Sequence, residues 1–285
     1  MRNLISSGLK RLKRQDSKYP QGDKSATVIA VATVKGGVGK TTSTINIAAA
    51  LASTHQKRVL LIDLDAQGHC STSLSALVPD APVYTPISEV LLADDQKQVL
   101  DSAVSTSYPN LDITPADSSL AEAEGLISQK IGKEMLLRDA LAITRTHYDV
   151  ILIDCPPNKG NLTLNALLAA DYVLIPTDLS PLAVQGADEL IDAVLTVNER
   201  LHHKLDVLGV VLTRVDGRNV SLNDEIRKQI KDAWGDYVLS SEIGVNTQLS
   251  QAQHEGQPIF AFAPKSRGAA HYSALAQEIY NRIFV

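Results

Sequence analysis

The hydrophobic positions of the chain alternate between short continuous runs and longer stretches with helical spacing. The first run, Thr27–Thr33, is apolar and β-branched, and a helix-like segment follows from Thr42 to about Ser53. Strand-like runs recur at Arg58–Asp63, Leu111–Pro115, Asp149–Asp154, Tyr172–Pro176 and Asp206–Thr213. Helical periodicity is clearest over Val184–Leu201 and Ser221–Trp234. Continuous apolar strands that alternate with helices predict an α/β fold, a mostly parallel sheet with helices on both faces.

Composition and charge favour one globular domain preceded by a basic extension. The chain has 285 residues, of which 44% are hydrophobic, and this is enough to bury a core of its own. Residues 1–24 carry seven basic and two acidic side chains, a local charge of +5, whereas the remainder carries −10. We predict a flexible extension over residues 1–25 and a single domain over residues 26–285, with attraction to polyanions confined to local patches.

The extension has three interpretations. Leu4, Ile5, Leu9 and Leu12 are spaced so that they would form a narrow apolar stripe on a helix, with lysine and arginine beside it. It is a solvated disordered leader, an arm that binds nucleic acid, or a helix that docks on a membrane or a partner. The sequence does not choose among the three.

Cysteine usage bears on the compartment. Cys70 and Cys155 lie far apart and lack the spacing of metal ligands, and the chain shows neither a signal peptide nor an apolar run that could span a bilayer. These features predict a cytoplasmic protein in a reducing environment.

A glycine-rich segment, Lys35–Thr42, stands between the first predicted strand and the first predicted helix. Strand, loop and helix in this order are the context of a phosphate-binding loop, or P-loop. Glycines lack a Cβ atom, so the backbone can turn its N–H groups onto anionic oxygens at the positive end of the helix. The glycines of the loop are Gly36, Gly37 and Gly39.

The remaining side chains of the loop suit a nucleotide triphosphate with its metal. Lys40 would reach the β- and γ-phosphates, and the hydroxyl of Thr41 would hold Mg²⁺. Val38 is too bulky to face the phosphates and would point away from them. Lys35 is a second lysine at the start of the loop, where ordinary P-loops have none.

Carboxylates end two of the predicted strands. Asp63 and Asp65 follow the run that begins at Arg58, and Asp154 follows the run that begins at Asp149. Because the carboxyl ends of parallel strands meet at one edge of a sheet, these acids should lie beside the P-loop. Hydrophobic residues followed by an acid form the Walker B pattern, whose aspartate orients Mg²⁺ or its waters.

Taken together, these segments resemble the ParA/MinD group of P-loop ATPases with a deviant Walker A motif, and within it the ParA-type partition proteins. The resemblance covers residues 26–285. It rests on Lys35–Thr42, Val59–Gly68, Asp154–Pro157, Leu164–Leu167 and Pro264–Ala269.

The resemblance implies roles for individual residues. Lys35 resembles the signature lysine that crosses an ATP-bound homodimer to the partner's phosphates, and Asp65 resembles the aspartate that positions the attacking water. Thr42 is expected near the α-phosphate, and Asp63 and Asp154 are expected at Mg²⁺. Adenine is expected near residues Thr213, Arg214 and Pro264.

The same resemblance implies a function. It predicts an ATP hydrolase that turns over slowly, is stimulated by a ParB-like or cargo-bound adaptor, and segregates plasmid or chromosomal DNA on non-specific DNA of the nucleoid. An alternative is a ParA-like ATPase that positions a protein cargo, such as a chemosensory cluster, a carboxysome or a cellulose-synthesis complex. Sequence alone does not separate the two.

A third alternative is a MinD-like ATPase that binds membranes. Such a protein needs an amphipathic helix at its C-terminus, and the segment Gln277–Val285 leaves little room for one. We expect Phe284 and Val285 to pack the last helix against the sheet instead.

Two positions depart from the family pattern at the predicted DNA surface. Many partition ATPases have arginines where this chain has Val245 and Gln248. A further difference is Ala66, which directly follows Asp65 at a position where the family commonly has a proline. Candidate replacements for the phosphate contacts are Arg214, Arg218, Arg227, Lys228, Lys231, Lys265 and Arg267.

Overall fold

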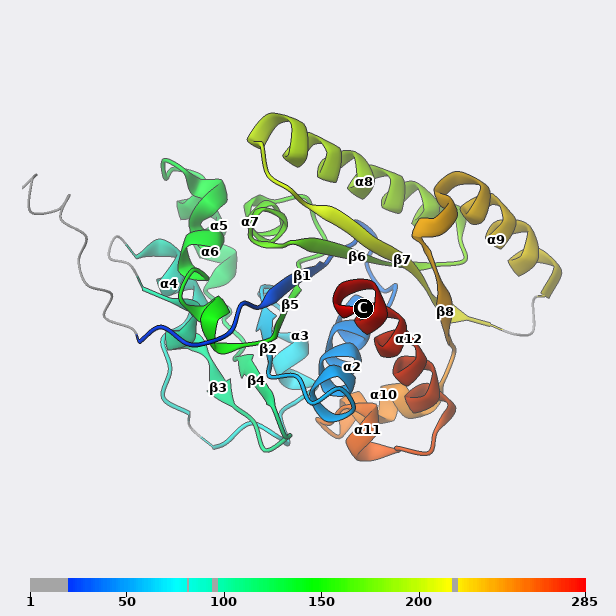
Figure 1. Ribbon diagram of the computed structural model, residues 1–285, viewed down its shortest axis with the longest axis horizontal. Helices are drawn as coiled ribbons and strands as arrows, with labels where there is room; N and C mark the ends of the chain where they lie inside the picture. Colours follow the sequence, from blue (N-terminus) through cyan, green and yellow to red (C-terminus); the bar gives the residue numbers. More distant parts are fainter. Residues whose placement is uncertain (1–19, 81, 94–96, 217–219) are drawn as a thin grey trace, which may run out of the picture.

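The computed structural model describes residues 20–285, apart from residues 81, 94–96 and 217–219. Eight strands form one sheet in the order β3-β4-β2-β5-β1-β6-β7-β8 (Figure 1). Their bounds are β1 Thr27–Val31, β2 Val59–Asp63, β3 Val104–Ser105, β4 Leu111–Thr114, β5 Val150–Asp154, β6 Tyr172–Asp178, β7 Asp206–Val215 and β8 Val238–Gly244. All neighbouring pairs are parallel except β3 and β4. The predicted α/β class is confirmed.

Helices cover both faces of this sheet. Their bounds are α2 Lys40–Ser53, α3 His69–Thr72, α4 Ile87–Leu92, α5 Leu120–Ile127, α6 Leu136–Ala140, α7 Asn161–Ala169, α8 Pro181–Leu201, α9 Val220–Trp234, α10 Thr247–His254, α11 Ile259–Phe262 and α12 Arg267–Phe284. Short 3₁₀ turns, Val99–Ser102, Lys133–Met135, Thr144–His147 and Gly235–Tyr237, lie between them. Within the described residues, no helix has the length and apolar character needed to cross a membrane.

The strands divide the core into two hydrophobic layers. Along β1, Val28 and Ala30 pack with helices α4 to α9, whereas Ile29 and Val31 pack with α2 and with α10 to α12. Figure 1 shows α8 and α9 on one side of the sheet and α2 and α12 on the other. Burial on both faces explains why the central strands read as continuous apolar runs.

Two strands were not expected from the sequence. β3 has only two residues and runs antiparallel to β4, so it carries no periodic signal. β8, of sequence VLSSEIG, is an edge strand with exposed or half-buried polar positions, and it pairs with β7 through an irregular register. Pairing at the edge, rather than burial on both faces, produces this strand.

The first described residues lie against the segment that leads into β5. The Gly22 N–H donates to Thr146 Oγ1 at 2.8 Å, and Lys24 Nζ lies 2.7 Å from Asp149 Oδ1. The apolar stripe predicted for the N-terminal extension falls on residues 1–19, outside the described residues.

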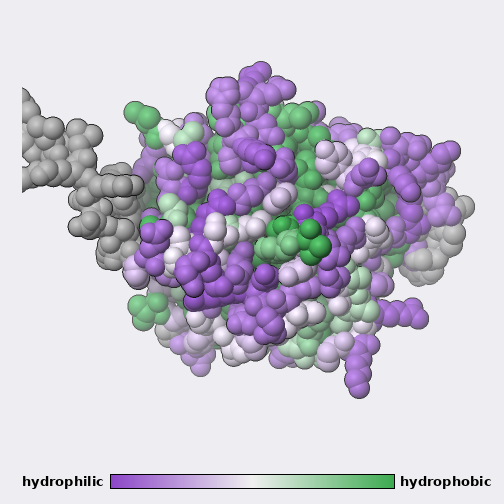
Figure 2. All heavy atoms as spheres, in the orientation of Figure 1, coloured by the Kyte–Doolittle hydropathy of each residue, from purple (hydrophilic) through white to green (hydrophobic). Residues whose placement is uncertain are grey.

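The end of α12 differs from the prediction. Phe284 is 37% exposed and Val285 is 95% exposed, so they do not pack the helix against the sheet. Figure 2 shows apolar atoms among hydrophilic ones where α12 ends. Leu275 and Ile279, one to three turns earlier, are fully buried and do the packing instead. The prediction failed because the helix continues past the edge of the core.

Candidate functional site

The glycine-rich loop joins β1 to α2 at the carboxyl edge of the sheet. Gly37 and Gly39 adopt positive φ angles of 78° and 79°, which a side chain would strain. Gly39 is also the N-cap of α2 and offers no side-chain hydrogen bond to it. The first N–H groups of this 14-residue helix are therefore available to an anion.

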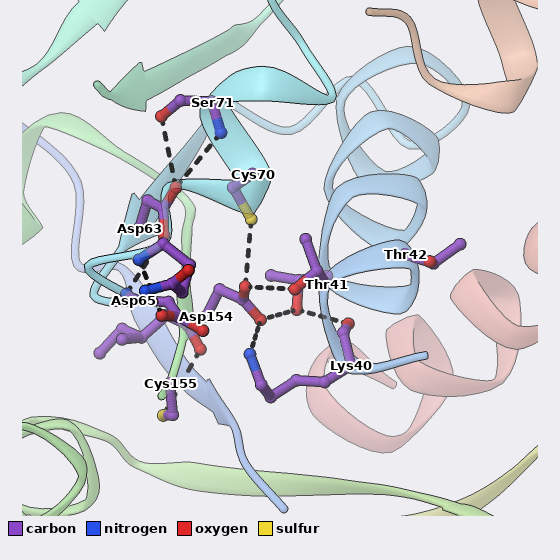
Figure 3. A network of polar contacts seen from close by, with 12 residues as sticks. Lys40, Thr41, Thr42, Asp63, Asp65, Cys70, Ser71, Asp154 and Cys155 are labelled. Atoms are coloured by element: carbon purple, nitrogen blue, oxygen red, sulfur yellow. Dashed lines mark hydrogen bonds and ion pairs between the residues drawn. The ribbon is translucent and has the colours of Figure 1, made fainter. Parts of the chain in front are cut away.

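Lys40 and Asp154 form a buried ion pair at the centre of the site. Lys40 Nζ lies 2.9 Å from Asp154 Oδ1, and their side chains are 8% and 0% exposed (Figure 3). Burial by itself would lower the pKa of Lys40, but the charge of Asp154 and its hydrogen bond raise that pKa above its ordinary value. The lysine is therefore a fixed cation.

Asp154 also accepts hydrogen bonds from the first turns of α2. Thr41 Oγ1 donates to Asp154 Oδ2 at 2.8 Å, and Thr44 Oγ1 donates to Asp154 Oδ1 at 3.0 Å. The strand-end acid and the hydroxyl that the sequence assigned to Mg²⁺ are thus adjacent. Thr44, which was not predicted as a site residue, lies one turn further along the same helix face.

Asp63 stands next to Asp154 because β2 and β5 pair in register at their last residues. Burial and the charge of Asp154 raise the pKa of Asp63 to about 7, although N–H groups of Ser71 and Asp65 bond to its carboxylate. Two adjacent buried carboxylates repel each other, and a divalent cation would relieve that repulsion.

The thiol of Cys70 belongs to the same cluster. Its Sγ lies 3.4 Å from Asp154 Oδ2, and ligand atoms of Asp63, Cys70 and Asp154 all lie within 4.8 Å of one another. Cys155 is also fully buried. Burial raises the pKa of both thiols. The nearby charges of Asp154 and Asp63 raise the pKa of Cys70 further. The hydroxyl and carboxylate oxygens around this cluster suit Mg²⁺, whereas a protonated thiol does not.

A cavity of about 590 Å³ opens beside the P-loop. Asp65 lines it and is 6% exposed, with its Oδ1 accepting a hydrogen bond from the Gln67 N–H at 3.0 Å. The lining also includes Lys35, Gly36, Gly37, Gly39, Lys40, Thr41, Thr42, Gln253 and His254. Val38 is fully buried and is not among the residues that line this cavity.

Lys35 is held within its own chain. Its Nζ contacts Asp178 at the end of β6 and lies 2.8 Å from Ser180 Oγ. Asp178 was not predicted as a site residue, although it follows a predicted strand, as Asp63 and Asp154 do.

A second cavity, of about 320 Å³, also borders the P-loop, at Gly37 and Gly39. Thr213 and Arg214, at the end of β7, line it, and Pro264 does not. Thr213 Oγ1 donates to the Val38 carbonyl at 2.6 Å, and Arg214 Nη1 donates to the Gly37 carbonyl at 2.7 Å. These two residues therefore connect β7 to the P-loop by side-chain hydrogen bonds.

The basic residues considered for DNA contact lie on separate elements. Arg227 is engaged by Glu242 and Asp224, with nitrogen–oxygen distances of 2.8 Å and 3.0 Å. Lys228 and Lys231 on α9 and the pair Lys265 and Arg267 at the start of α12 are exposed, as are Val245 and Gln248. Arg218 lies outside the described residues.

Comparison with known proteins gives consistent matches. A family model described as an AAA domain matches residues 26–207. The chromosome partitioning protein ParA of Caulobacter vibrioides is 39% identical over 90% of this chain and 94% of its own length. The sporulation initiation inhibitor protein Soj of Bacillus subtilis is 39% identical over 88% of this chain and 97% of its own length.

A solved structure shares this architecture. It is a crystal structure described as cobyrinic acid a,c-diamide synthase from Mycobacterium smegmatis with bound ADP and magnesium. The two chains superpose with a TM-score of 0.73 and 32% identity, over 88% of this chain and 93% of the other.

Proposed function

Because the chain belongs to the ParA/MinD family of P-loop ATPases, we propose that it binds ATP with Mg²⁺, dimerises in that state and hydrolyses the ATP slowly. One observation carries the proposal: Lys35, Lys40 and Asp65 line a single cavity at the N-terminus of α2. This cavity combines an anion-binding helix end with two cations and a carboxylate, which phosphoryl transfer to water requires.

The residues divide the chemistry between them. Lys40 and the loop N–H groups bind the β- and γ-phosphates, Thr42 lies toward the α-phosphate, and Thr41, Asp63 and Asp154 hold Mg²⁺ or its waters. The metal supplies charge neutralisation when it is bound. Thr213 and Arg214 border the space for adenine, whereas Pro264, also expected there, does not line the second cavity.

Asp65 orients the attacking water, and Lys35 supplies positive charge across the dimer. The carboxylate of Asp65 can orient water but is a poor general base for it, so turnover is slow. The Lys35 charge reaches the phosphates of the other subunit only when two subunits meet. An adaptor of the ParB-like or cargo-bound class would then speed hydrolysis by reorganising these groups.

The cargo we propose is plasmid or chromosomal DNA, moved over non-specific DNA of the nucleoid. Support comes from the partition proteins to which the chain is similar and from exposed basic residues, Lys228 and Lys231 on α9 and Lys265 and Arg267 at the start of α12. A positively charged patch binds the DNA backbone without reading sequence.

The test is co-sedimentation and mobility shift with non-specific duplex DNA and with anionic liposomes, each with ATP, ADP or no nucleotide. We expect DNA binding that needs ATP and weakens as salt rises. ATP-dependent binding to liposomes without DNA binding would contradict this function and indicate a MinD-like role. Binding to neither would contradict movement over the nucleoid.

A further inference from the structure

The two cavities beside the P-loop meet at four residues. Gly37, Gly39 and Thr42 line both of them, and so does Gln253. The first three belong to the loop and to the first turn of α2. Gln253 is the one member of this shared set that comes from α10, and neither a nucleotide nor a DNA role was assigned to it from the sequence.

The position of Gln253 is fixed by the packing of its helix. Leu249 and Ala252 are buried in the core, and this sets which face of α10 turns toward α2. Asn246 caps the start of the helix by accepting the Gln248 N–H at 2.8 Å. Gln253, half-buried, then donates from Nε2 to Thr42 Oγ1 at 3.0 Å.

A nucleotide would have to pass between the two cavities. In the proposed function, on which this inference rests, the triphosphate occupies the larger cavity at Lys40 and the base occupies the smaller one at Thr213. The sugar and the α-phosphate join these parts, so they lie where the cavities meet. The carboxamide of Gln253 retains a second N–H and an acceptor oxygen after its bond to Thr42, and both can contact this part of the ligand.

We infer that Gln253 is a nucleotide-binding residue that contacts the ribose of ATP and ADP at its junction with the α-phosphate. Both nucleotides have this junction, whereas inorganic triphosphate lacks the sugar. Gln253 therefore contributes to holding the nucleoside end of the ligand, separately from the lysine that holds its phosphates.

The experiment compares Gln253→Ala with Gln251→Ala, a matched change on the exposed side of the same helix. Calorimetry would measure the affinity of each full-length protein for ATP, ADP and inorganic triphosphate with Mg²⁺. We expect Gln253→Ala to weaken ATP and ADP by about 3- to 10-fold and to leave inorganic triphosphate unchanged. It should raise KM and leave kcat near the wild-type value. Gln251→Ala should change none of these.

Two results would overturn the inference. Unchanged ATP affinity in Gln253→Ala would show that the carboxamide does not touch the ligand. An equal loss for ATP and inorganic triphosphate would show that Gln253 acts only by supporting Thr42 and the P-loop. Failure of the proposed function is distinguishable from both, because the wild-type protein would then bind no nucleotide.

Discussion

Lys35 Nζ lies 3.0 Å from Asp178 Oδ1 and 2.9 Å from Asp178 Oδ2, so the lysine at the start of the P-loop is paired with the end of β6 in the same chain. The two side chains are 30% and 23% exposed. A partly exposed pair of this kind contributes about 0.5–1 kcal/mol. To reach the phosphates of another subunit, Lys35 has to leave this pairing.

Replacing Asp178 should therefore favour the dimer. Asp178→Asn removes the charge that holds Lys35, and two such pairs break for each dimer formed. We expect the dimer dissociation constant with a non-hydrolysable ATP analogue to fall by about 5- to 30-fold, measured by analytical ultracentrifugation. Asp192→Asn, an exposed change on α8, is the control. Unchanged or weaker dimerisation would show that the pairing of Lys35 with Asp178 does not oppose dimer formation.

Lys40→Ala should abolish nucleotide binding, because it removes the buried cation at the P-loop. It also leaves Asp154 without its ion-pair partner, which costs about 3–5 kcal/mol in the free energy of unfolding. Calorimetry with ATP and chemical denaturation would measure the two effects separately. The exposed Lys204→Ala is the control.

A double variant separates binding from folding. Adding Asp154→Asn to Lys40→Ala removes the unpaired charge and should recover part of the lost stability, without recovering ATP binding. Near-normal ATP affinity in the folded single variant would show that the P-loop assignment is wrong.

Asp65→Ala should bind ATP and dimerise but cease to turn over. The carboxylate faces the cavity and bonds to the Gln67 N–H, so its loss removes the group that orients water without altering the Lys40 pair. We expect kcat to fall by about 10²- to 10⁴-fold in a phosphate-release assay. The exposed Asp80→Ala is the control, and normal hydrolysis by Asp65→Ala would exclude the water-positioning role.

The helix α9 offers a test of the DNA surface. Lys228 and Lys231 are exposed, whereas the guanidinium of Arg227 is already held by Glu242. We expect the double variant Lys228→Ala, Lys231→Ala to weaken ATP-dependent DNA binding. The slope of log K against the logarithm of the salt concentration should decrease in magnitude by about 2. Arg227→Ala should leave the salt dependence unchanged. If Arg227→Ala reduced this slope as much, Arg227 would leave Glu242 and contact a DNA phosphate in the complex.

The ion pair of Lys24 with Asp149 predicts a pH dependence of stability. Burial opposes ionisation of Asp149, but hydrogen bonds from Lys24 and the Arg58 N–H lower its pKa below the ordinary value. Because the pKa of this carboxyl is lower in the folded state, its ionisation stabilises the folded protein at pH values above the unfolded-state pKa of about 3.9. This contribution to the free energy of unfolding disappears as the pH falls through the folded-state pKa.

Asp149→Asn should therefore be less stable than the wild type by about 1 kcal/mol at pH 7, and the difference should shrink toward pH 3. Urea denaturation at pH 7, 5, 4 and 3 measures it. Asp232→Asn, exposed on α9, is the control. A difference that stays constant down to pH 3 would mean that the Asp149 charge does not contribute.

Local patterns in the sequence predicted the family, the α/β class and the strand-end acids. The reason is that a buried parallel strand requires a continuous apolar run, and a phosphate-binding loop requires glycines at fixed spacing. The bounds of these runs shifted by only a few residues: the segment expected at Asp149–Asp154 is Val150–Asp154, and Tyr172–Pro176 extends to Asp178. The roles assigned to individual site residues stay predictions.

The pairing of side chains across the site depended on the tertiary structure. The sequence placed Lys35 and Asp154 at one edge, but only the strand order β5-β1-β6 puts Asp154 beside Lys40 and Asp178 beside Lys35. The contact of Gln253 with Thr42 joins positions 211 residues apart, and no local periodicity encodes it. Local spacing sets which chemistry each element carries, whereas sheet order and helix packing decide which groups meet.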